Sequence, residues 1–209
     1  MPQNQKALFN LGLAGLPSFT IGVFGLAAKI IGGVVRIKVN VRTDQERQWQ
    51  AAKLNPIPGV QIIDCPGGGV CVLESLEDAL KREIREETGG CDICIMGRFR
   101  PPIPFINNDP SKPSDLAVWA PVVLIGDPKP SNEASSHPWI TREQLEAETE
   151  YRCVSGLGNK GRTGQMLRAA FDWYEDEANR KKVEIFSRPT EDPFFVCERC
   201  QVNPCVCGK

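Results

Sequence analysis

Histidine and net charge are both scarce in this 209-residue sequence, and each scarcity narrows the range of functions. His137 is the single histidine and therefore the one candidate for a histidine general base, so a carboxylate base is the simpler expectation. A net charge of −1 argues against a dominant nucleic-acid or acidic-membrane surface, and nucleic acid is not an expected partner. What is present is the composition of an ordinary soluble protein, with 41% apolar and 24% charged residues.

Long apolar runs are missing as well. The most apolar stretch, residues 11–35, contains six glycines, Pro17 and Lys29, and lacks the uninterrupted run of about 20 apolar residues that a membrane helix needs. Lys6 is the one basic residue before it, too little for a cleavable signal. The nine cysteines are an odd count, which favours reduced thiols or metal ligands over disulfides. We expect no membrane span and a cytoplasmic protein.

Residues 68–90 carry most of the functional information. Glycines at 67–69 form a turn that is unsuited to a regular element and lets a ligand approach the main chain. Ser75 is a good N-cap, with Asp78 at the capping-box spacing, so we expect a helix from about 76 to 88 that stops at Gly89. Apolar residues at three- and four-residue spacing give this helix one buried stripe.

The same helix carries clustered carboxylates. Glu83, Glu86 and Glu87 are neighbours on a helix surface, and Arg82 alone does not balance them. A solvated acidic face is the ordinary explanation for such a cluster. The glycine turn, Glu74 and Gly89 at fixed offsets instead favour a site for Mg²⁺ or Mn²⁺, because these cations prefer carboxylate oxygens and are usually held together with substrate phosphates.

This stretch resembles the Nudix box, G-x5-E-x7-R-E-U-x-E-E-x-G-U, where U is aliphatic. The matching positions are Gly68, Glu74, Arg82, Glu83, Ile84, Glu86, Glu87 and Gly89, and Gly90 departs from the pattern. The resemblance implies a metal-dependent hydrolase that cleaves a diphosphate linked to another moiety. It also implies that Glu83, Glu86 and Glu87 hold the metal, that Arg82 orients the glutamates, and that Gly68 shapes the loop next to substrate.

An α/β (α+β) fold follows, with a Nudix-type mixed β-sheet between helices. Strands are expected at 19–31, 34–41, 60–65, 91–99 and 116–125, where apolar residues alternate or run together between turn residues. Besides the box helix, a short helix capped by Thr141 and a helix over 165–182 are expected, with a loop or short helix at 42–55. The expected domains are an N-terminal arm at 1–17, a hydrolase domain at 18–188, and a linker with a cysteine-rich tail at 189–209.

A proline-rich stretch at 100–108 is expected to be an extended loop, because proline cannot serve in a central strand. Phe105 in it can either stack on a base or fill the core. The stretch partly resembles the S-Q-P-W-P-F-P-x-S motif of NADH pyrophosphatases, with Pro102, Pro104 and Phe105 in phase but without the Ser-Gln pair and the Trp. Phe105 and Arg100 are therefore candidate substrate-binding residues.

Two other segments are candidates for the site. Glu133 precedes Trp139-Ile-Thr141-Arg-Glu-Gln-Leu145, similar to the Glu that Nudix proteins carry shortly before such a motif, so Glu133 is a candidate metal ligand or general base. A glycine-rich loop at 156–164 contains Lys160 and Arg162 and could contact phosphate, although basic loops are common.

Four thiols lie close together near the end of the chain, at Cys197, Cys200, Cys205 and Cys207. Four thiolates suit tetrahedral Zn²⁺, and a tail with few apolar residues needs a metal to order it. We expect structural zinc here, with disordered reduced thiols, or an iron–sulfur or redox role, as the alternatives. Cys91 and Cys94 also form a C-x2-C pair, but on a strand residues three apart face opposite sides, so we expect ordinary buried cysteines.

The leading hypothesis is a hydrolase of a nucleoside diphosphate linked to another moiety, such as NADH, ADP-ribose or a nucleotide sugar. A non-catalytic nucleotide-sensing or nucleic-acid-touching protein is the alternative from another class. An enzyme acting on oxidised nucleoside triphosphates or capped RNA is a third possibility. The expected partner is a small nucleotide substrate. Oligomeric state cannot be read from the sequence, and a homodimer is one candidate assembly.

Overall fold

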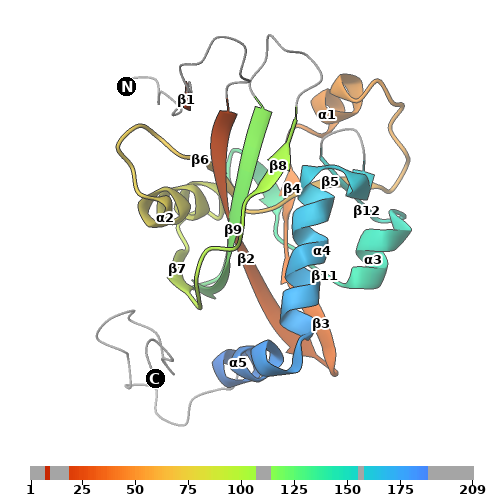
Figure 1. The fold of residues 1–209 in the computed structure, drawn as a ribbon. Helices are drawn as coiled ribbons and strands as arrows, with labels where there is room; N and C mark the ends of the chain where they lie inside the picture. Colours follow the sequence, from red (N-terminus) through yellow and green to blue (C-terminus); the bar gives the residue numbers. More distant parts are fainter. Residues whose placement is uncertain (1–7, 10–18, 107–113, 155–157, 188–209) are drawn as a thin grey trace.

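Two mixed β-sheets form the centre of the protein (Figure 1). The computed structural model describes residues 8–9, 19–106, 114–154 and 158–187. The strands are β1 (Leu8–Phe9), β2 (Phe19–Ile31), β3 (Val34–Lys38), β4 (Asn40–Arg42), β5 (Gln61–Asp64), β6 (Gly67–Gly69), β7 (Asp92–Ile95), β8 (Ile103–Phe105), β9 (Ser114–Ile125), β10 (Ala134–Ser136), β11 (Trp139–Ile140) and β12 (Tyr151–Cys153). The helices are α1 (Gln45–Ala51), α2 (Leu76–Glu87), α3 (Arg142–Ala147), the short 3₁₀ helix η1 (Gly158–Lys160), α4 (Arg162–Glu175) and α5 (Glu177–Ser187).

The larger sheet is built on the long parallel pair β2 and β9. Its order is β11-β3-β2-β9-β7, while β1 and β6 also pair with β2 and β8 pairs with β9. The smaller sheet has the order β10-β4-β5-β12. Phe19 pairs with Ser114 and Ala27 with Val122, so β2 and β9 stay in register over their common length. The expected mixed sheet is confirmed, and it is divided into two.

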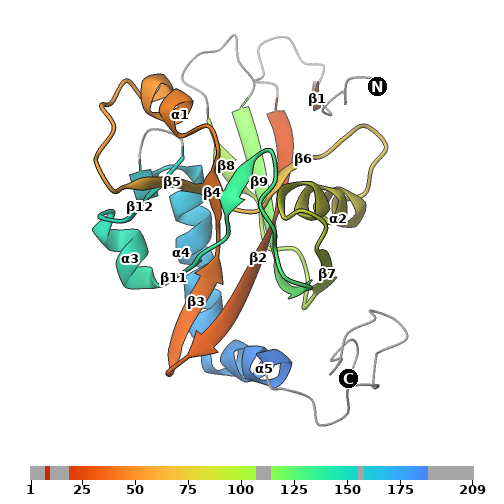
Figure 2. The ribbon, with the colours of Figure 1, turned by 180° about the vertical axis from the view of Figure 1, so that it is seen from behind.

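Successive side chains of β2 face opposite sides of the sheet, as the pleat requires. Phe24 and Leu26 join a cluster that α4 covers with Met166, Leu167 and Phe171. Val23 and Ala27 join a second cluster that α2 covers with its own apolar stripe, Ala79, Leu80 and Ile84. The sheet is thus sandwiched between helices, and Figures 1 and 2 show α2 and α4 from the two sides.

The expected strand over 34–41 is interrupted at Val39. The alternation predicted for Val35, Ile37, Val39 and Val41 is confirmed, because all four are buried in the α4-side cluster. The chain nevertheless changes sheets at Val39, whose N–H donates to Pro138 O at 3.1 Å. β3 therefore belongs to the larger sheet and β4 to the smaller one, and this step brings the strand end at Arg42 to the box helix.

The helix expected over 165–182 is in fact two helices. Asp176 has extended backbone angles between α4 and α5, and its carboxylate accepts hydrogen bonds from the N–H groups of Ala178 and Asn179. An aspartate that caps the first turn of a new helix competes with the continuing helix. The apolar periodicity continues across Asp176 and so conceals this break.

Three short strands form in addition to those expected. The glycine turn contains β6, which pairs with β2 because glycines allow a very close approach: a Cβ on Gly67 would lie 2.6 Å from Phe24 Cα. The proline-rich stretch contains β8, which pairs with β9 on one side. The loop at 128–137 contains β10, which pairs with β4. The strand expected over 91–99 shortens to β7.

The terminal predictions lie mostly outside the described residues. In the N-terminal arm, Leu8–Phe9 pairs with β2. Cys197, Cys200, Cys205 and Cys207 are outside the described part. Cys91 and Cys94 are buried, as expected for packing residues. None of the helices in the described ranges is long and apolar enough to cross a bilayer.

Candidate active site

A pocket of about 420 Å³ opens where β2, β6 and the exposed side of α2 face the ends of β4, β5 and α4. It gathers residues from seven distant parts of the chain, which explains why no single motif describes it. Its lining comprises Thr20, Ile21, Gly22, Phe24, Arg42, Asp64, Gly67, Gly68, Gly69, Cys71, Arg82, Glu83, Glu86, Glu87, Asp115, Glu133 and Arg162. All the box residues predicted as metal ligands are in this set.

Helix α2 forms as the sequence predicts. Ser75 Oγ accepts a hydrogen bond from Asp78 N at 3.1 Å, which satisfies one of the free N–H groups of the first turn. Leu80 and Ile84 are fully buried against the second cluster, so burial fixes the rotation of the helix. The face that carries Arg82 and Glu86 is thereby turned toward the pocket.

Arg82 connects the helix to the loop before it. Its Nε and one terminal nitrogen donate to both oxygens of Glu74 at 2.8 and 2.9 Å. The same guanidinium donates to Gly69 O at 2.9 Å and to Glu83 at 2.7 Å. Hydrogen bonds from Arg82 lower the pKa of Glu74 to about 2. Arg82 thus orients Glu83, the role implied for it, while Glu74 fixes Arg82.

Gly68 is required by the position of Glu83. A Cβ at Gly68 would lie 2.5 Å from the carboxyl carbon of Glu83, so a side chain here would force the carboxylate to move. The absence of a side chain here lets the Glu83 carboxylate lie directly against the loop. The glycine therefore shapes the site by close approach of main chain and carboxylate.

Glu87 is a buried carboxyl at the base of the pocket, with 6% of its surface exposed. Gly67 N donates to it at 2.7 Å and Asn40 Nδ2 donates at 2.9 Å. Burial is the main cause that raises the pKa of Glu87 to about 9, and the charges of Asp64, Glu133 and Glu83 add to it. The site therefore holds more negative charge than its own hydrogen bonds offset.

Asn40 and His137 support Glu87 from behind. Asn40 Oδ1 lies 2.8 Å from His137 Nδ1, and His137 Nε2 lies 3.0 Å from Lys129 O. Burial lowers the pKa of His137. The single histidine is absent from the pocket lining, so its contact with the site passes through the amide of Asn40.

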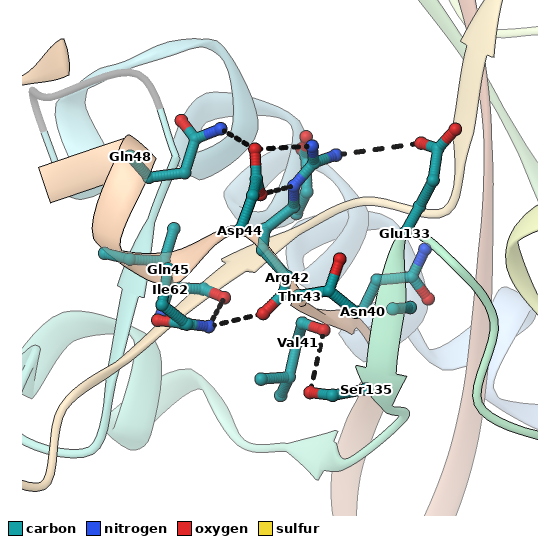
Figure 3. A network of polar contacts seen from close by, with 12 residues as sticks. Asn40, Val41, Arg42, Thr43, Asp44, Gln45, Gln48, Ile62, Glu133 and Ser135 are labelled. Carbon is teal, nitrogen blue, oxygen red and sulfur yellow. Dashed lines mark hydrogen bonds and ion pairs between the residues drawn. The ribbon is translucent and has the colours of Figure 1, made fainter. Parts of the chain in front are cut away.

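Glu133 lies at the rim of the pocket, opposite the helix. Its side chain is 61% exposed, and its carboxylate is 4.0 Å from the Arg42 guanidinium (Figure 3). Arg42 is itself held by Asp44, to which its Nε donates at 3.0 Å. The backbone of Glu133 is fixed, since Thr43 N donates to its carbonyl at 3.0 Å. The side chain can therefore turn while its attachment point stays in place.

Two predicted substrate residues are placed elsewhere. Phe105 is half-buried and packs against the α4-side cluster, which is the second of the two roles considered for it. Arg100 donates its backbone N–H to Trp119 O at 2.7 Å. Neither residue is among those that line the pocket. Phe105 and Arg100 thus lie apart from the pocket that contains the box glutamates, Gly68 and also Glu133.

Three charged residues of the pocket carried no usable sequence signal, Arg42, Asp64 and Asp115, and a fourth, Arg162, carried only a weak one. Arg162 lies at the start of α4, donates to Asp115 at 3.1 Å and sits over the Phe24 ring. It belongs to the glycine-rich loop considered for phosphate, whereas Lys160 is exposed and absent from the lining. Asp64 accepts a hydrogen bond from Thr163 Oγ1 at 2.8 Å. These residues meet only through the pairing of distant strands.

The carboxylates of the pocket fit a hard divalent cation by their chemistry. They are all oxygen donors, they lie around one space, and the raised pKa of Glu87 shows negative charge that a cation would offset. In the described ranges, no three His, Cys, Asp or Glu side chains already converge on a metal-sized point. Glu83 is turned to Arg82 and Glu87 to Gly67, while Glu86 is 56% exposed and can turn inward.

Comparisons with known proteins agree with this geometry. The NUDIX domain model matches residues 41–154, more than half of the chain. Comparison with curated proteins gave no match. Among solved structures, a UDP-X diphosphatase aligns with a TM-score of 0.51 and 15% identity over 78% of this chain and 64% of that one. A NUDIX hydrolase from Nitrosomonas europaea aligns with a TM-score of 0.50 and 12% identity, over 74% of this chain and 88% of that one.

A third likeness is to the MutT protein from Methanosarcina mazei Go1, with a TM-score of 0.47 and 20% identity over 74% of this chain and 93% of that one. At these identities the structural likenesses show the fold alone. The family model, in contrast, covers the box, the loop before it and Glu133. The chain therefore belongs to the NUDIX domain family, whose hydrolases act on phosphoanhydride bonds.

Proposed function

We propose that this protein hydrolyses the diphosphate of a nucleoside diphosphate linked to another moiety, of the NADH, ADP-ribose or nucleotide-sugar type. The observation that carries the proposal is the distribution of charge around one pocket. The box carboxylates of α2 line this pocket, and Arg42 of β4 and Arg162 of α4 line it as well. A metal bound by the carboxylates and two guanidinium groups in the same pocket suit a diphosphate, which needs cations on more than one oxygen.

Glu83, Glu86 and Glu87 would hold Mg²⁺ or Mn²⁺. When bound, the metal polarises a phosphoryl oxygen and lowers the pKa of bound water. The chain's own groups then position the reaction. Arg82 holds Glu83, and the Gly67 N–H and Asn40 hold Glu87. Glu133 serves as the base that accepts the proton of the attacking water, because its carboxylate lies at the rim and can reach into the pocket.

The nucleoside part of the substrate would lie beyond the carboxylates, toward Thr20, Phe24 and Arg162. Arg162 over the Phe24 ring, together with Asp115, forms a polar and aromatic wall of the same pocket. Such a wall can offer both hydrogen bonds and a flat contact to a base. Phe105 and Arg100 remain proposals for substrate contact that a mutational test must decide.

The test is a product assay on NADH, ADP-ribose, nucleotide sugars, dinucleoside polyphosphates and 8-oxo-dGTP, each with Mg²⁺ or Mn²⁺. We expect release of a nucleoside monophosphate from one diphosphate-linked compound, and a loss of roughly a hundredfold or more in Glu86→Gln. The matched control is Glu77→Gln on the same helix, which pairs only with Lys81 in an exposed position. Turnover that persists in Glu86→Gln would refute the assigned metal ligands.

Other outcomes of the panel choose between the remaining hypotheses. Cleavage of 8-oxo-dGTP alone would replace the proposed substrate class with oxidised nucleoside triphosphates. Calorimetric binding of a nucleotide without any product would favour a sensing protein. Either result would leave the pocket as the nucleotide-binding site but would refute the proposed hydrolysis of a diphosphate-linked compound.

We also infer that the cysteine-rich tail binds structural zinc, with Cys197, Cys200, Cys205 and Cys207 as ligands. The inference rests on the spacing of the four thiols alone. Elemental analysis of the purified chain should give one zinc per chain and none in a Cys200→Ser variant. A chain without zinc under reducing conditions would contradict the inference. A cytoplasmic location, which keeps these thiols reduced, belongs to the same proposal.

A further inference from the structure

A second pocket, of about 240 Å³, lies apart from the candidate active site and shares no lining residue with it. It lies among β2, β3, the turn after β9, and β11, with Val183 of α5 closing one side. Figure 2 shows α5 near the turn of the β2–β3 hairpin, apart from α2. Apolar residues such as Met96 and Leu124 form part of the pocket wall.

The centre of this pocket is the ring of Trp139 with two lysines beside it. Lys29 Nζ lies 4.4 Å from the ring centroid, and Lys38 Nζ lies 4.6 Å from it. All three residues line the pocket. A cation over a tryptophan face is attracted by the ring, but the ring does not neutralise the charge. Two ammonium groups of the pocket therefore lie against one tryptophan ring.

Strand register places these charges together. Trp139 pairs with Lys38 across β11 and β3, and Lys29 pairs with Arg36 across β2 and β3. Lys38 and Arg36 are two residues apart on β3, so their side chains point to the same side of the sheet as Lys29. Arg36 adds a third positive charge at the edge, and its Nε is buried without a hydrogen-bond partner in the described structure.

The positive charge is only partly balanced from within, by Asp127, whose charge acts on Lys38. Asp127 is the one acidic residue among the described residues that line the pocket. Within the described ranges, neither Lys29 nor Lys38 makes an ion pair or a side-chain hydrogen bond. Lys38 is only 9% exposed, and its burial, followed by repulsion from Lys29, lowers its pKa. Burial of an ammonium group without an acceptor costs free energy, and a bound anion would remove that cost.

We propose that this pocket binds a small organic oxyanion, a phosphate or carboxylate group carried on a compact apolar body. The oxyanion lies between Lys29 and Lys38, and the body packs on Trp139, Met96 and Leu124. Lysine suits this role as a point charge that places few demands on the geometry of the anion. The pocket is smaller than the usual range of roughly 300–1,000 Å³ for ligand sites, so the occupant is smaller than a nucleotide.

Intrinsic fluorescence tests the proposal, because Trp139 is both part of the site and one of four tryptophans. The full chain is titrated with phenyl phosphate and with benzoate in EDTA, so that no divalent metal supports anion binding at the candidate active site. Benzyl alcohol is the uncharged control. We expect a saturable change in emission with at least one anion, none with benzyl alcohol, and none in Trp139→Phe. The anion that binds more tightly shows whether the pocket prefers a phosphate or a carboxylate group.

Lysine variants locate the binding. Lys38→Met and Lys29→Met should each raise the dissociation constant of the anion by at least about tenfold. Lys53→Met, at an exposed lysine after α1, should bind like the parent chain. Thermal unfolding of each variant shows whether it is folded. Lys29 is less buried than Lys38, so Lys29→Met still tests the proposal if Lys38→Met does not fold. Unchanged emission with both anions, or full affinity in Lys29→Met, would overturn the proposal.

Discussion

Individual residues of the site differ most in how their charge is compensated. Glu74 shares its two oxygens with Arg82 and is the best compensated carboxylate of the loop. Glu87 receives only two neutral donors in a buried position. Glu86 stays mostly in solvent, 3.6 Å from Arg82. Three glutamates of one motif thus have different tasks, and their surroundings rather than their spacing set those tasks.

The raised pKa of Glu87 predicts how the metal-free protein responds to pH. The pKa in the folded state is about 9, above the unfolded value near 4.5, so folding takes up a proton between these values. The contribution of Glu87 is therefore present at low pH and is lost as pH rises toward 9. In EDTA at pH 8, Glu87→Gln should raise Tm by roughly 3 °C or more, because the uncharged amide avoids the buried charge.

The difference in Tm between Glu87→Gln and the parent chain should become smaller as pH falls toward 5. Scanning calorimetry at several pH values measures it. Glu77→Gln, an exposed change of the same chemistry, should show no such dependence. A Glu87→Gln chain that is less stable than the parent at pH 8 in EDTA would mean that the charged form is favoured in the fold.

At the scale of elements, the site depends on the junction between the loop and α2. The helix is fixed by Ser75 and by its buried stripe, while the loop is fixed by the pairing of β6 with β2. Arg82 and Glu74 connect the two, and Cys71 N also donates to Glu74 at 3.0 Å. Glu74 therefore acts as a positioning residue that never needs to touch the metal.

Glu74→Gln tests this junction. Loss of a partly buried, charged hydrogen bond costs about 1.5–3 kcal/mol, so Tm should fall by roughly 3–10 °C. Turnover should fall roughly ten- to a hundredfold with little change in KM, because Glu83 loses its orientation while the pocket stays open. Glu77→Gln is again the control. Turnover lost without any change in Tm would instead indicate that Glu74 takes part directly in the reaction.

Across the whole molecule, two sheets and two helices bring together charges that the sequence separates. Asp64, Asp115 and Glu133 come from β5, β9 and the loop before β10, and all line the same pocket as the carboxylates of α2. The charges of Asp64 and Glu133 repel that of Glu87, and a bound cation would offset this repulsion. The stability of the entire domain should therefore depend on divalent metal.

Metal addition to the metal-free chain should raise Tm. At 100 times the dissociation constant, linkage gives about 2.7 kcal/mol, or roughly 5–10 °C for a chain of this size. The rise with Mg²⁺ or Mn²⁺ should be smaller in Glu86→Gln and nearly absent when Glu83 is also changed to Gln. Differential scanning fluorimetry in EDTA against added metal measures it. An equal rise in the double variant would place the metal outside the box.

Near neighbours along the chain set the local features of this protein. Ser75, the apolar stripe of α2 and the alternation over 35–41 depend on residues only a few positions away, so the box helix and the carboxylates that it brings to the pocket could be predicted. Sequence reasoning found Glu133 by a motif, and the structure places it at the same pocket.

Tertiary structure alone decided what surrounds the box. Arg42, Asp64, Asp115 and Arg162 reach the pocket because distant strands pair, and no periodicity encodes that meeting. The same applies to Lys29 and Lys38 around Trp139, which strand register assembles. Short-range patterns fix elements, because helices and strands are stabilised by near neighbours. Long-range packing fixes burial and charge, and these determine both the high pKa of Glu87 and the only partly balanced charge of the lysines.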